Sequence, residues 1–361
     1  MSVISMKCPN CEGELIFNPA TQKYKCEYCG SEFLLTDIGE PETEEPIRET
    51  ENFDDHVQDS SAASDDDTAD RERAVIYSCP SCGAQIMTDE TTAATFCYFC
   101  HNPIVLSGQV AGDFKPDMII PFSIDRKQAE EHFLDFVHKK KFVPNSFFNK
   151  KQIEKLSGVY FPYWVYDGEL SGKLEAEGSR IRVWVSGDVE YTETKVYHIE
   201  RDGDVSIRDL TKNAHRKSDL LLAEGVLPYD FSKAEEFRMG YLSGFFAEKR
   251  DIEWEELEPQ VKEEVYHYTE ELLQDTIQGY TGVHTLNCTV RPGENRWSYT
   301  LLPVWTVTYK GSNGKMYYYS MNGQNGKTYG ELPVDYKKVF LFGAIIGIIV
   351  FFAFLIGGYF L

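Results

Sequence analysis

Apolar positions along the chain change their spacing several times, and each change predicts a different element. The run Ile119-Ile120-Pro121-Phe122 predicts a short strand. Residues 125–140 then repeat apolar side chains at helical spacing, behind Ser123 or Asp125, either of which can cap a helix. A second, shorter helix is expected over residues 149–156.

The spacing becomes alternating after Gly158, which predicts β structure. Residues 159–170 and 180–210 alternate apolar and polar side chains. Turns are expected at Ser186-Gly187-Asp188 and at Asp202-Gly203-Asp204, because Gly and Asp accept the backbone angles that tight turns require. The pattern therefore indicates several strands of ordinary length joined by turns.

Helical spacing returns over residues 232–242 and Pro259–Ile277, where Pro259 suits a first turn. The apolar face expected for the second helix consists of Val261, Val265, Leu272 and Thr276. Residues 284–332 then read as a meander of short strands. Asn313-Gly314 and Asn325-Gly326 are its tight-turn dipeptides.

A faint internal repeat links two of these β segments. Residues 161–166 read FPYWVY and residues 302–307 read LPVWTV, so a proline precedes a tryptophan by two positions in both. A single shared Pro-x-Trp is weak evidence on its own. It predicts that the β-rich body contains two related units.

Composition divides the chain into five parts. We expect a first zinc ribbon, an acidic disordered linker, a second zinc ribbon, an α+β main domain rich in strands, and a transmembrane helix, at residues 1–36, 37–73, 74–107, 108–335 and 339–361. The linker is acidic, rich in Ser and Thr and poor in apolar residues, so it cannot bury enough surface to offset the entropy of ordering. We expect a self-repelling spacer there; a specific acidic interaction segment is the alternative.

The last 23 residues carry no charge and are long enough, as a helix, to cross a hydrocarbon core of about 30 Å. Lys337 and Lys338 precede this run, so the positive-inside bias places residues 1–338 in the cytoplasm. Gly343 and Gly347 have a spacing found in paired membrane helices, and a homodimer through them is one alternative. The prediction is a single-pass tail anchor in the inner membrane, with a lipid bilayer around it.

The formal net charge of −22 limits the choice of partners. Nucleic-acid binding rests on Lys and Arg replacing counterions along the phosphates, which a strongly acidic chain opposes. The same charge argues against a broad electrostatic contact with an anionic membrane surface. Protein partners are therefore expected.

Eight of the nine cysteines fall into two copies of one frame, in which two CxxC pairs are separated by fourteen residues. Four thiolates with this pairing suit a tetrahedral Zn²⁺ ion. We expect two structural Zn²⁺ sites, with the ligands Cys8, Cys11, Cys26 and Cys29 in one and Cys79, Cys82, Cys97 and Cys100 in the other. Iron of the rubredoxin type and disulfides are the alternatives. Because four thiolates leave no open position, neither site is expected to be catalytic.

Two other patterns carry no chemistry. Gly326-Lys327-Thr328 resembles the end of a phosphate-binding loop, but Met321 stands where that loop needs glycine. The aromatic residues of 297–329 lack basic neighbours and predict a β-sheet core rather than a base-stacking platform. Cys288 lies in an alternating strand and is expected to be a buried thiol. We find no catalytic cluster in the sequence, and the chain is not expected to be an enzyme.

The order of parts resembles a family of bacterial membrane proteins with TFIIB-type zinc ribbons, sometimes labelled primosomal or helicase-like. The matching segments are residues 119–122, 158–168, 227–237, 240–251 and 301–335, together with the ribbons. Such proteins are similar to products of envelope-stress gene clusters that also encode phage-shock-like and SPFH-like membrane scaffolds. The resemblance implies a membrane-bound zinc-ribbon protein that helps to hold such scaffolds at the membrane, and it supplies no catalytic residues.

Sequence reasoning therefore favours a non-enzymatic adaptor that faces the cytosol and recruits or scaffolds protein partners at the membrane. Three alternatives remain open. The ribbons could bind nucleic acid, as in transcription or replication factors; the CxxC pairs could transfer electrons; and the main domain could hold an enzymatic site without a recognised motif.

Overall fold

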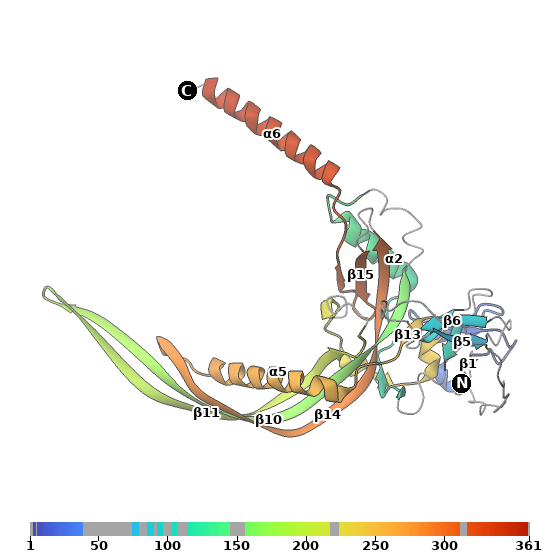
Figure 1. Ribbon diagram of the computed structural model, residues 1–361, viewed down its shortest axis with the longest axis horizontal. Coiled ribbons are helices and arrows are strands. Elements are labelled where there is room, and N and C mark those ends of the chain that lie inside the picture. The colour runs from blue at the N-terminus through green and yellow to red at the C-terminus, as the bar shows by residue number, and fades with distance from the viewer. Residues whose placement is uncertain are drawn as a thin grey trace, which may run out of the picture.

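The computed structural model describes residues 3–4, 6–38, 74–78, 85–89, 92–96, 103–106, 114–144, 156–216, 224–310 and 316–359. These residues form a mixed α/β structure that is rich in sheet. Figure 1 shows a head from which a long curved arm extends, while the C-terminal helix α6 (Tyr336–Tyr359) leaves the head separately. The expected helix at 149–156 lies outside the described residues except for Leu156, and so does the expected turn at Asn313-Gly314.

Three long strands form the arm: β10 (Ser157–Ser186), β11 (Val189–Asn213) and β14 (Gly282–Lys310). With 30 residues, β10 is about 100 Å long. It pairs with β11 and β14 in antiparallel ladders, and helix α5 (Trp254–Asp275) lies along the arm (Figure 1). The turn predicted at Ser186-Gly187-Asp188 is confirmed at the end of the arm, where Gly187 has a φ of 65°.

The head contains the shorter elements of the main sheet. They are the strands β9 (Met118–Ile119), β12 (Glu235–Glu236), β13 (Phe246–Glu248), β15 (Met316–Asn322) and β16 (Thr328–Gly330), the helix α2 (Arg126–His138), and the 3-10 turns η4 (Phe231–Lys233) and η5 (Met239–Leu242). The main order is β1-β8-β7-β13-β10-β14-β15-β16, with β11 beside β10 and β9 beside β14 and β12.

Segments that flank the cysteines form two small sheets and also extend the main sheet. The first ribbon is a three-stranded sheet of β2 (Leu15–Asn18), β3 (Lys23–Cys26) and β4 (Glu32–Phe33), followed by the four-residue helix α1 (Leu35–Ile38). From the segment expected to hold the second ribbon, β5 (Ala74–Ser78) and β6 (Gln85–Asp89) form a separate pair, whereas β7 (Thr92–Phe96) and β8 (Pro103–Leu106) extend the main sheet. Strand β1 (Val3–Ile4) pairs with β8, so the N-terminus is also joined to this sheet.

The predicted internal repeat is confirmed by matching hydrogen bonds. The indole N–H of Trp164 donates to the backbone carbonyl of Ile252 at 2.9 Å. The indole of Trp305, from the second Pro-x-Trp, donates to the carbonyl of Ile124 at 3.0 Å. In each case the acceptor stands directly before the N-cap residue of a helix, α5 or α2.

The repeat extends to the backbone beyond the two hairpins. Ala214 N–H donates to Pro162 O at 3.0 Å, and Gly323 N–H donates to Pro303 O at 2.8 Å. Ala214 O in turn accepts from the backbone N–H groups of residues 251 and 252, as Gly323 O does from those of residues 123 and 124. The bonds to Ala214 O join the end of β11 to the residues just before α5. The bonds to Gly323 O join the end of β15 to the residues just before α2.

The structure thus contains two units of the order short strand, helix, long strand, antiparallel strand. The first is β9, α2, β10 and β11, and the second is β13, α5, β14 and β15. β9 runs parallel to β14, and β13 runs parallel to β10, so each unit places its first strand on the central strand of the other. Both helices begin with a capping box, at Asp125 and at Glu253.

Helix α2 agrees with its sequence prediction and α5 agrees in part. Asp125 is the N-cap of α2, and Ala129, Phe133 and Val137 are buried on one face. α5 begins at Trp254, so Pro259 lies inside the helix rather than in its first turn. The buried face of α5 consists of Val261, Val265, Thr269 and Leu273. The predicted Leu272 is instead 50% exposed.

Three expectations are wrong because strand pairing between distant segments outweighs the local pattern. No turn forms at residues 202–204, because Gly203 pairs with Gly172 in the middle of the β10–β11 ladder. Residues 232–242 form no α-helix: Glu235 and Glu236 form β12 and pair with β9, between two 3-10 turns. The expected meander is also simpler, because residues 284–310 belong to one strand, β14.

We predict that the two buried indole hydrogen bonds contribute comparably to stability. Trp164→Phe and Trp305→Phe should each lower the free energy of unfolding by about 1–3 kcal/mol, because each removes the donor to a partly buried carbonyl and leaves a small void beside a buried ring. Chemical denaturation of the full chain in detergent, followed by circular dichroism, measures this. Trp184→Phe, at the exposed end of the arm, is the control and should change stability by less than about 0.5 kcal/mol. A negligible effect of either buried substitution would contradict the equivalence of the two units.

Candidate metal centre

The first four predicted ligands come together at one end of the three-stranded ribbon. The sulfur atoms of Cys8, Cys11, Cys26 and Cys29 all lie within 4.8 Å of one another. Cys8 Sγ is 3.6 Å from Cys29 Sγ, and Cys11 Sγ is 3.5 Å from Cys26 Sγ. Four sulfurs placed tetrahedrally at about 2.3 Å from a zinc ion stand about 3.8 Å apart, whereas a disulfide needs about 2.05 Å. The arrangement therefore fits a metal site and not a pair of disulfides.

Two equivalent turns hold these sulfurs in place. Cys8 N–H donates to Gly13 O at 2.7 Å, and Cys26 N–H donates to Ser31 O at 2.9 Å. Within the turns, Glu12 and Gly30 both have positive φ, at 59° and 71°. Each CxxC pair thus lies on a tight loop that turns both of its thiols toward the same point.

The site is half open to solvent. Cys8 and Cys26 are buried, and Cys11 and Cys29 are exposed. The hydroxyl and the backbone N–H of Ser31 lower the pKa of the Cys29 thiol to about 6, which favours the thiolate that a metal requires. Gly13 leaves room for the sulfurs, because a Cβ there would lie 3.2 Å from Cys26 Sγ and 3.3 Å from Cys11 Sγ.

The ligands predicted for the second site, Cys79, Cys82, Cys97 and Cys100, lie outside the described residues. Their flanking strands β5 to β8 are described, and β7 and β8 are paired through Ala94 and Val105. The remaining cysteine, Cys288, is partly buried in β14, and burial raises its pKa. The expected burial of this thiol is therefore confirmed only in part.

The first ribbon is packed against the head, which the sequence did not indicate. Phe17 N–H donates to Ser243 O at 3.2 Å, and the Ser243 hydroxyl donates to Leu15 O at 2.5 Å. The Phe17 ring lies edge-on to Tyr241, with centroids 5.5 Å apart. Gly244, with a φ of 92°, brings the backbone close to Ile16. A metal bound in the ribbon would therefore also hold this docking face in shape.

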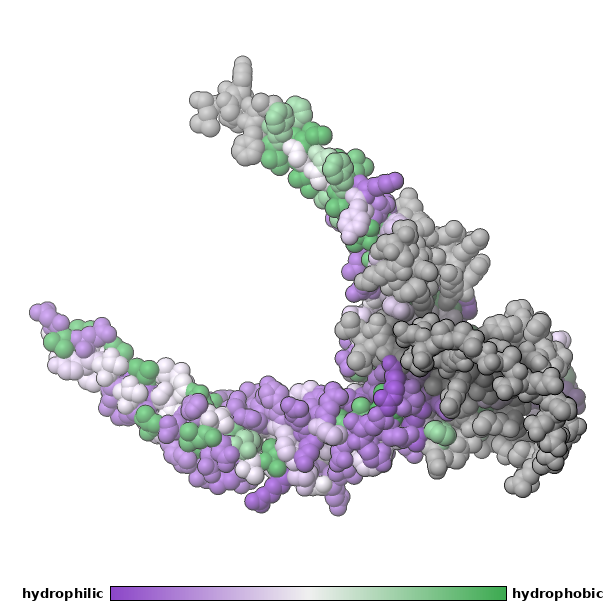
Figure 2. Space-filling model, in the orientation of Figure 1, coloured by the Kyte–Doolittle hydropathy of each residue, from purple (hydrophilic) through white to green (hydrophobic). Residues whose placement is uncertain are grey.

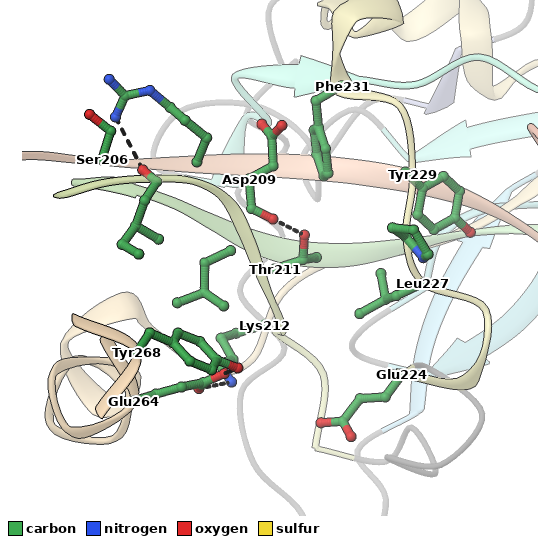
Figure 3. Close-up of a pocket in the computed structure, with 14 residues that line it drawn as sticks. Ser206, Asp209, Thr211, Lys212, Glu224, Leu227, Tyr229, Phe231, Glu264 and Tyr268 are labelled. Atoms are coloured by element: carbon green, nitrogen blue, oxygen red, sulfur yellow. Dashed lines mark hydrogen bonds and ion pairs between the residues drawn. The ribbon is translucent and has the colours of Figure 1, made fainter. Parts of the chain in front are cut away.

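A pocket of about 720 Å³ lies where the arm meets the head, between β11, residues 224–231 and α5 (Figure 3). Two of its charged side chains pair with each other, and Arg208 pairs with Glu169 outside the lining. Lys212 forms an ion pair with Glu264, which also accepts a hydrogen bond from the Tyr268 hydroxyl at 2.9 Å. Burial and the nearby Asp167 raise the pKa of Asp209. The lining includes no histidine or cysteine.

The other rejected patterns have structural explanations among the described residues. Lys327 belongs to the turn between β15 and β16, where Asn322 N–H donates to its carbonyl at 2.8 Å. Among the aromatic residues of β14 and β15, Tyr299, Trp305 and Tyr319 are buried in the core, and Trp297, Tyr317 and Tyr318 are partly buried. Both results agree with the sequence analysis.

Helix α6 is the one described helix that is long and apolar enough to cross a membrane. None of that stretch is buried against the rest of the protein, and Figure 2 shows its apolar surface projecting from the head. Gly343 and Gly347 face open space. These observations weakly indicate membrane anchoring by α6.

Comparison with known proteins identifies one similar curated sequence. It is named Uncharacterized protein YdjG and comes from Bacillus subtilis (strain 168). The two are 29% identical over 337 residues, which cover 93% of this chain and 92% of that protein. The similarity therefore extends well beyond the cysteine frames. No protein-family model matches the chain, and no solved structure matches it.

We predict that the full chain purified under reducing conditions carries two zinc ions. Cys26→Ser should remove one and Cys97→Ser the other, because three thiolates bind zinc far more weakly than four. Elemental analysis of the purified protein measures both the metal and its stoichiometry. Iron in place of zinc, or an unchanged metal content in both variants, would contradict the assignment.

A second prediction concerns the space beside the sulfurs. Gly13→Ala should make zinc loss to a competing chelator about tenfold faster, because the added methyl group presses on two ligands. The control is Gly282→Ala on the arm, where a Cβ would meet Ser179 Oγ at a similar 3.3 Å. Equal rates for the two variants would mean that Gly13 has no role at the metal.

Proposed function

We propose that this protein is a non-enzymatic adaptor, anchored in a membrane by α6, that recruits a partner protein through the end of its β arm. The adaptor facing the cytosol is the arrangement that sequence reasoning favours. The observation that carries the proposal is the exposed apolar surface at the end of the arm. This surface lies far from the head, so its apolar side chains do not pack into the core there (Figure 1).

This surface, the arm tip, consists of apolar side chains from both strands of the hairpin: Ile181, Val183, Trp184, Val185, Val189 and Tyr191. Val183 and Val185 are 54% and 67% exposed. Trp184 and Tyr191 are opposite each other in the ladder and stack with ring centroids 5.5 Å apart. Exposed apolar groups of this kind mark interaction sites, and stacked aromatic rings offer a large contact area at little entropic cost.

The charges of the arm tip favour a protein partner over a lipid surface. Asp188 lies in the turn, and Glu190 and Glu193 follow it on β11. These carboxylates lie beside Arg182 and Lys195, and Lys195 forms an ion pair with Glu193 at 3.5 Å. The mixed charges give an anionic bilayer no net attraction, whereas a protein surface can match each charge. Arg182 lies over the Trp184 ring, 5.6 Å from its centroid, and adds a further polar contact point.

The other parts of the chain support the same role. A four-thiolate metal site is closed and structural, so the first ribbon supplies a rigid surface rather than chemistry. In the pocket at the base of the arm, Lys212 is paired with Glu264 and Arg208 with Glu169. The resemblance to envelope-stress zinc-ribbon proteins implies an SPFH-like or phage-shock-like scaffold as the class of partner.

A site-specific photocrosslinker tests the proposal in living cells. Placed at Val185 in the full chain, it should capture one discrete protein, and reciprocal purification of that protein should recover this chain. The same group at Leu272, which is exposed on α5, is the matched control and should not capture it. Val183→Ser with Val185→Ser should reduce the yield at least about tenfold, since a buried valine contributes about 1.5 kcal/mol or more and 1.4 kcal/mol is a tenfold change.

Three results would count against the adaptor. They are the absence of a specific protein at Val185 with and without intact ribbons, equal capture at Val185 and Leu272, and capture of nucleic acid with salt-dependent affinity. The last would favour the nucleic-acid alternative.

A further inference from the structure

We propose that the end of the head next to α6 binds anionic phospholipid headgroups through a cluster of lysines, the basic collar, defined as Lys139, Lys140, Lys141 and Lys337. The inference rests on the proposed anchoring by α6. It goes beyond that role because it assigns a lipid class to a site in the head rather than to the span.

The collar is a local exception in an acidic protein. Three consecutive lysines follow the last residue of α2, His138, and all three are exposed, in a chain of net charge −22. Lys337 is exposed in the first turn of α6. Because the overall charge repels anionic surfaces, such a concentration of cations at one end has a large effect on which surface the head can approach.

Direct contacts hold the two parts of the collar together. Asp335 N–H donates to Phe142 O at 2.7 Å, and the Lys338 ammonium donates to Val143 O at 2.7 Å. The Phe142 and Phe342 rings lie 5.5 Å apart, with a T-shaped geometry. The chain that follows the three lysines is therefore attached to the beginning of α6, although nearly two hundred residues separate the two segments.

The carboxylate of Asp335, which directly precedes α6, is already engaged in hydrogen bonds. Asp335 accepts the backbone N–H of Lys337 at 3.0 Å and that of Lys338 at 3.4 Å, and so caps the helix. It thereby satisfies the helix N-terminus. Lys338 is tied to Val143 and acts as a positioning residue. Lys140 lies over the Phe136 ring, 5.6 Å from its centroid, and the collar lysines remain exposed to an external anion.

The place of the collar in the molecule identifies the anion. The collar lies beside the start of the only described candidate span, because Phe142 and Val143, which follow the three lysines, contact Asp335 and Lys338. If α6 crosses a bilayer, the first charged groups on this side must lie at the headgroup level. Clusters of four or more basic residues directly beside a span attract anionic lipids, and charge complementarity therefore selects an anionic headgroup.

The lysines have an alternative, purely structural role, because cations at the C-terminus of α2 complement its dipole. That role predicts an effect on stability and none on lipid composition. A measurement of the lipids retained by the protein separates the two.

The test uses the full chain reconstituted in phosphatidylcholine vesicles that contain a minor fraction of phosphatidylglycerol. After mild detergent extraction, mass spectrometry counts both lipids bound to the purified protein. Phosphatidylglycerol should be enriched about threefold or more over the bulk mixture. The enrichment should disappear in the variant Lys139→Gln, Lys140→Gln, Lys141→Gln, and also at about 1 M salt, where the Debye length falls to about 3 Å. The control Lys173→Gln, Lys195→Gln, Lys262→Gln removes three exposed lysines of the arm and α5 and should retain it.

Alkaline extraction of the same vesicles distinguishes failure of the collar from failure of the anchor. If the chain resists extraction but binds both lipids in the bulk ratio, the collar inference is wrong and the anchoring by α6 stands. Loss of stability in the collar variant without a change in lipid ratio would assign the lysines to the helix dipole and also overturn it. If the wild-type chain is extracted, both the anchoring and the collar are refuted.

Discussion

The antiparallel ladder between β10 and β14 is the interaction on which the remaining structure depends. Each of these strands gives part of its outer edge to a short parallel strand of the other unit and the rest to its own hairpin partner. The residue before the N-cap of each helix, Ile252 for α5 and Ile124 for α2, accepts a hydrogen bond from the indole of Trp164 or Trp305. Neither unit can complete its sheet edge or anchor its helix alone, so the units must fold together. This mutual dependence explains why Pro162 and Pro303 are tolerated near the centre of the sheet: their carbonyls, rather than their nitrogens, make the connection to the next segment.

The first hairpin, β10 and β11, is paired over many more residues than the second, β14 and β15. Beyond the head, a three-stranded ribbon has two faces and little core, and α5 covers one of these faces only over part of its length. The helix lies close because the strand beneath it has no side chain at Gly172, where a Cβ would come within 2.7 Å of Leu273 and 2.8 Å of Thr269. After α5, Ile277 and Tyr280 still pack on the ribbon, and the Tyr280 ring lies 5.6 Å from that of Tyr197. Closer to the tip, the apolar side chains of the hairpin face solvent. The exposed arm tip is therefore a consequence of a hairpin that is longer than its covering helix.

The elements with local determinants could be predicted from the sequence. The first cysteine frame, the capped start of α2 and the turn at Gly187 each depend on residues close together in the chain, and all three agree with the structure. The failures concern pairing between distant segments. The Asp-Gly-Asp at 202–204 favours a turn locally, but a continuous ladder with β10 outweighs it. Glu235 and Glu236 have a helical context, yet the backbone of β9 needs a partner, and they provide it. The docking of the first ribbon on Ser243 likewise depends on contacts that no single segment encodes.

The two units share a framework but differ in the charges that they carry at corresponding ends. Helix α2 is followed by three lysines, whereas the last turns of α5 carry Glu270, Glu271 and Asp275. One helix end lies beside α6, and the other lies along the arm, away from it (Figure 1). An exact repeat would have placed the same charge at both ends and given the molecule no preferred orientation toward a charged surface. Divergence between the units instead makes the end at α6 basic and the arm acidic, so an anionic bilayer would attract the first and repel the second. This polarity would hold the arm away from the lipid and present its tip to partners in the aqueous phase.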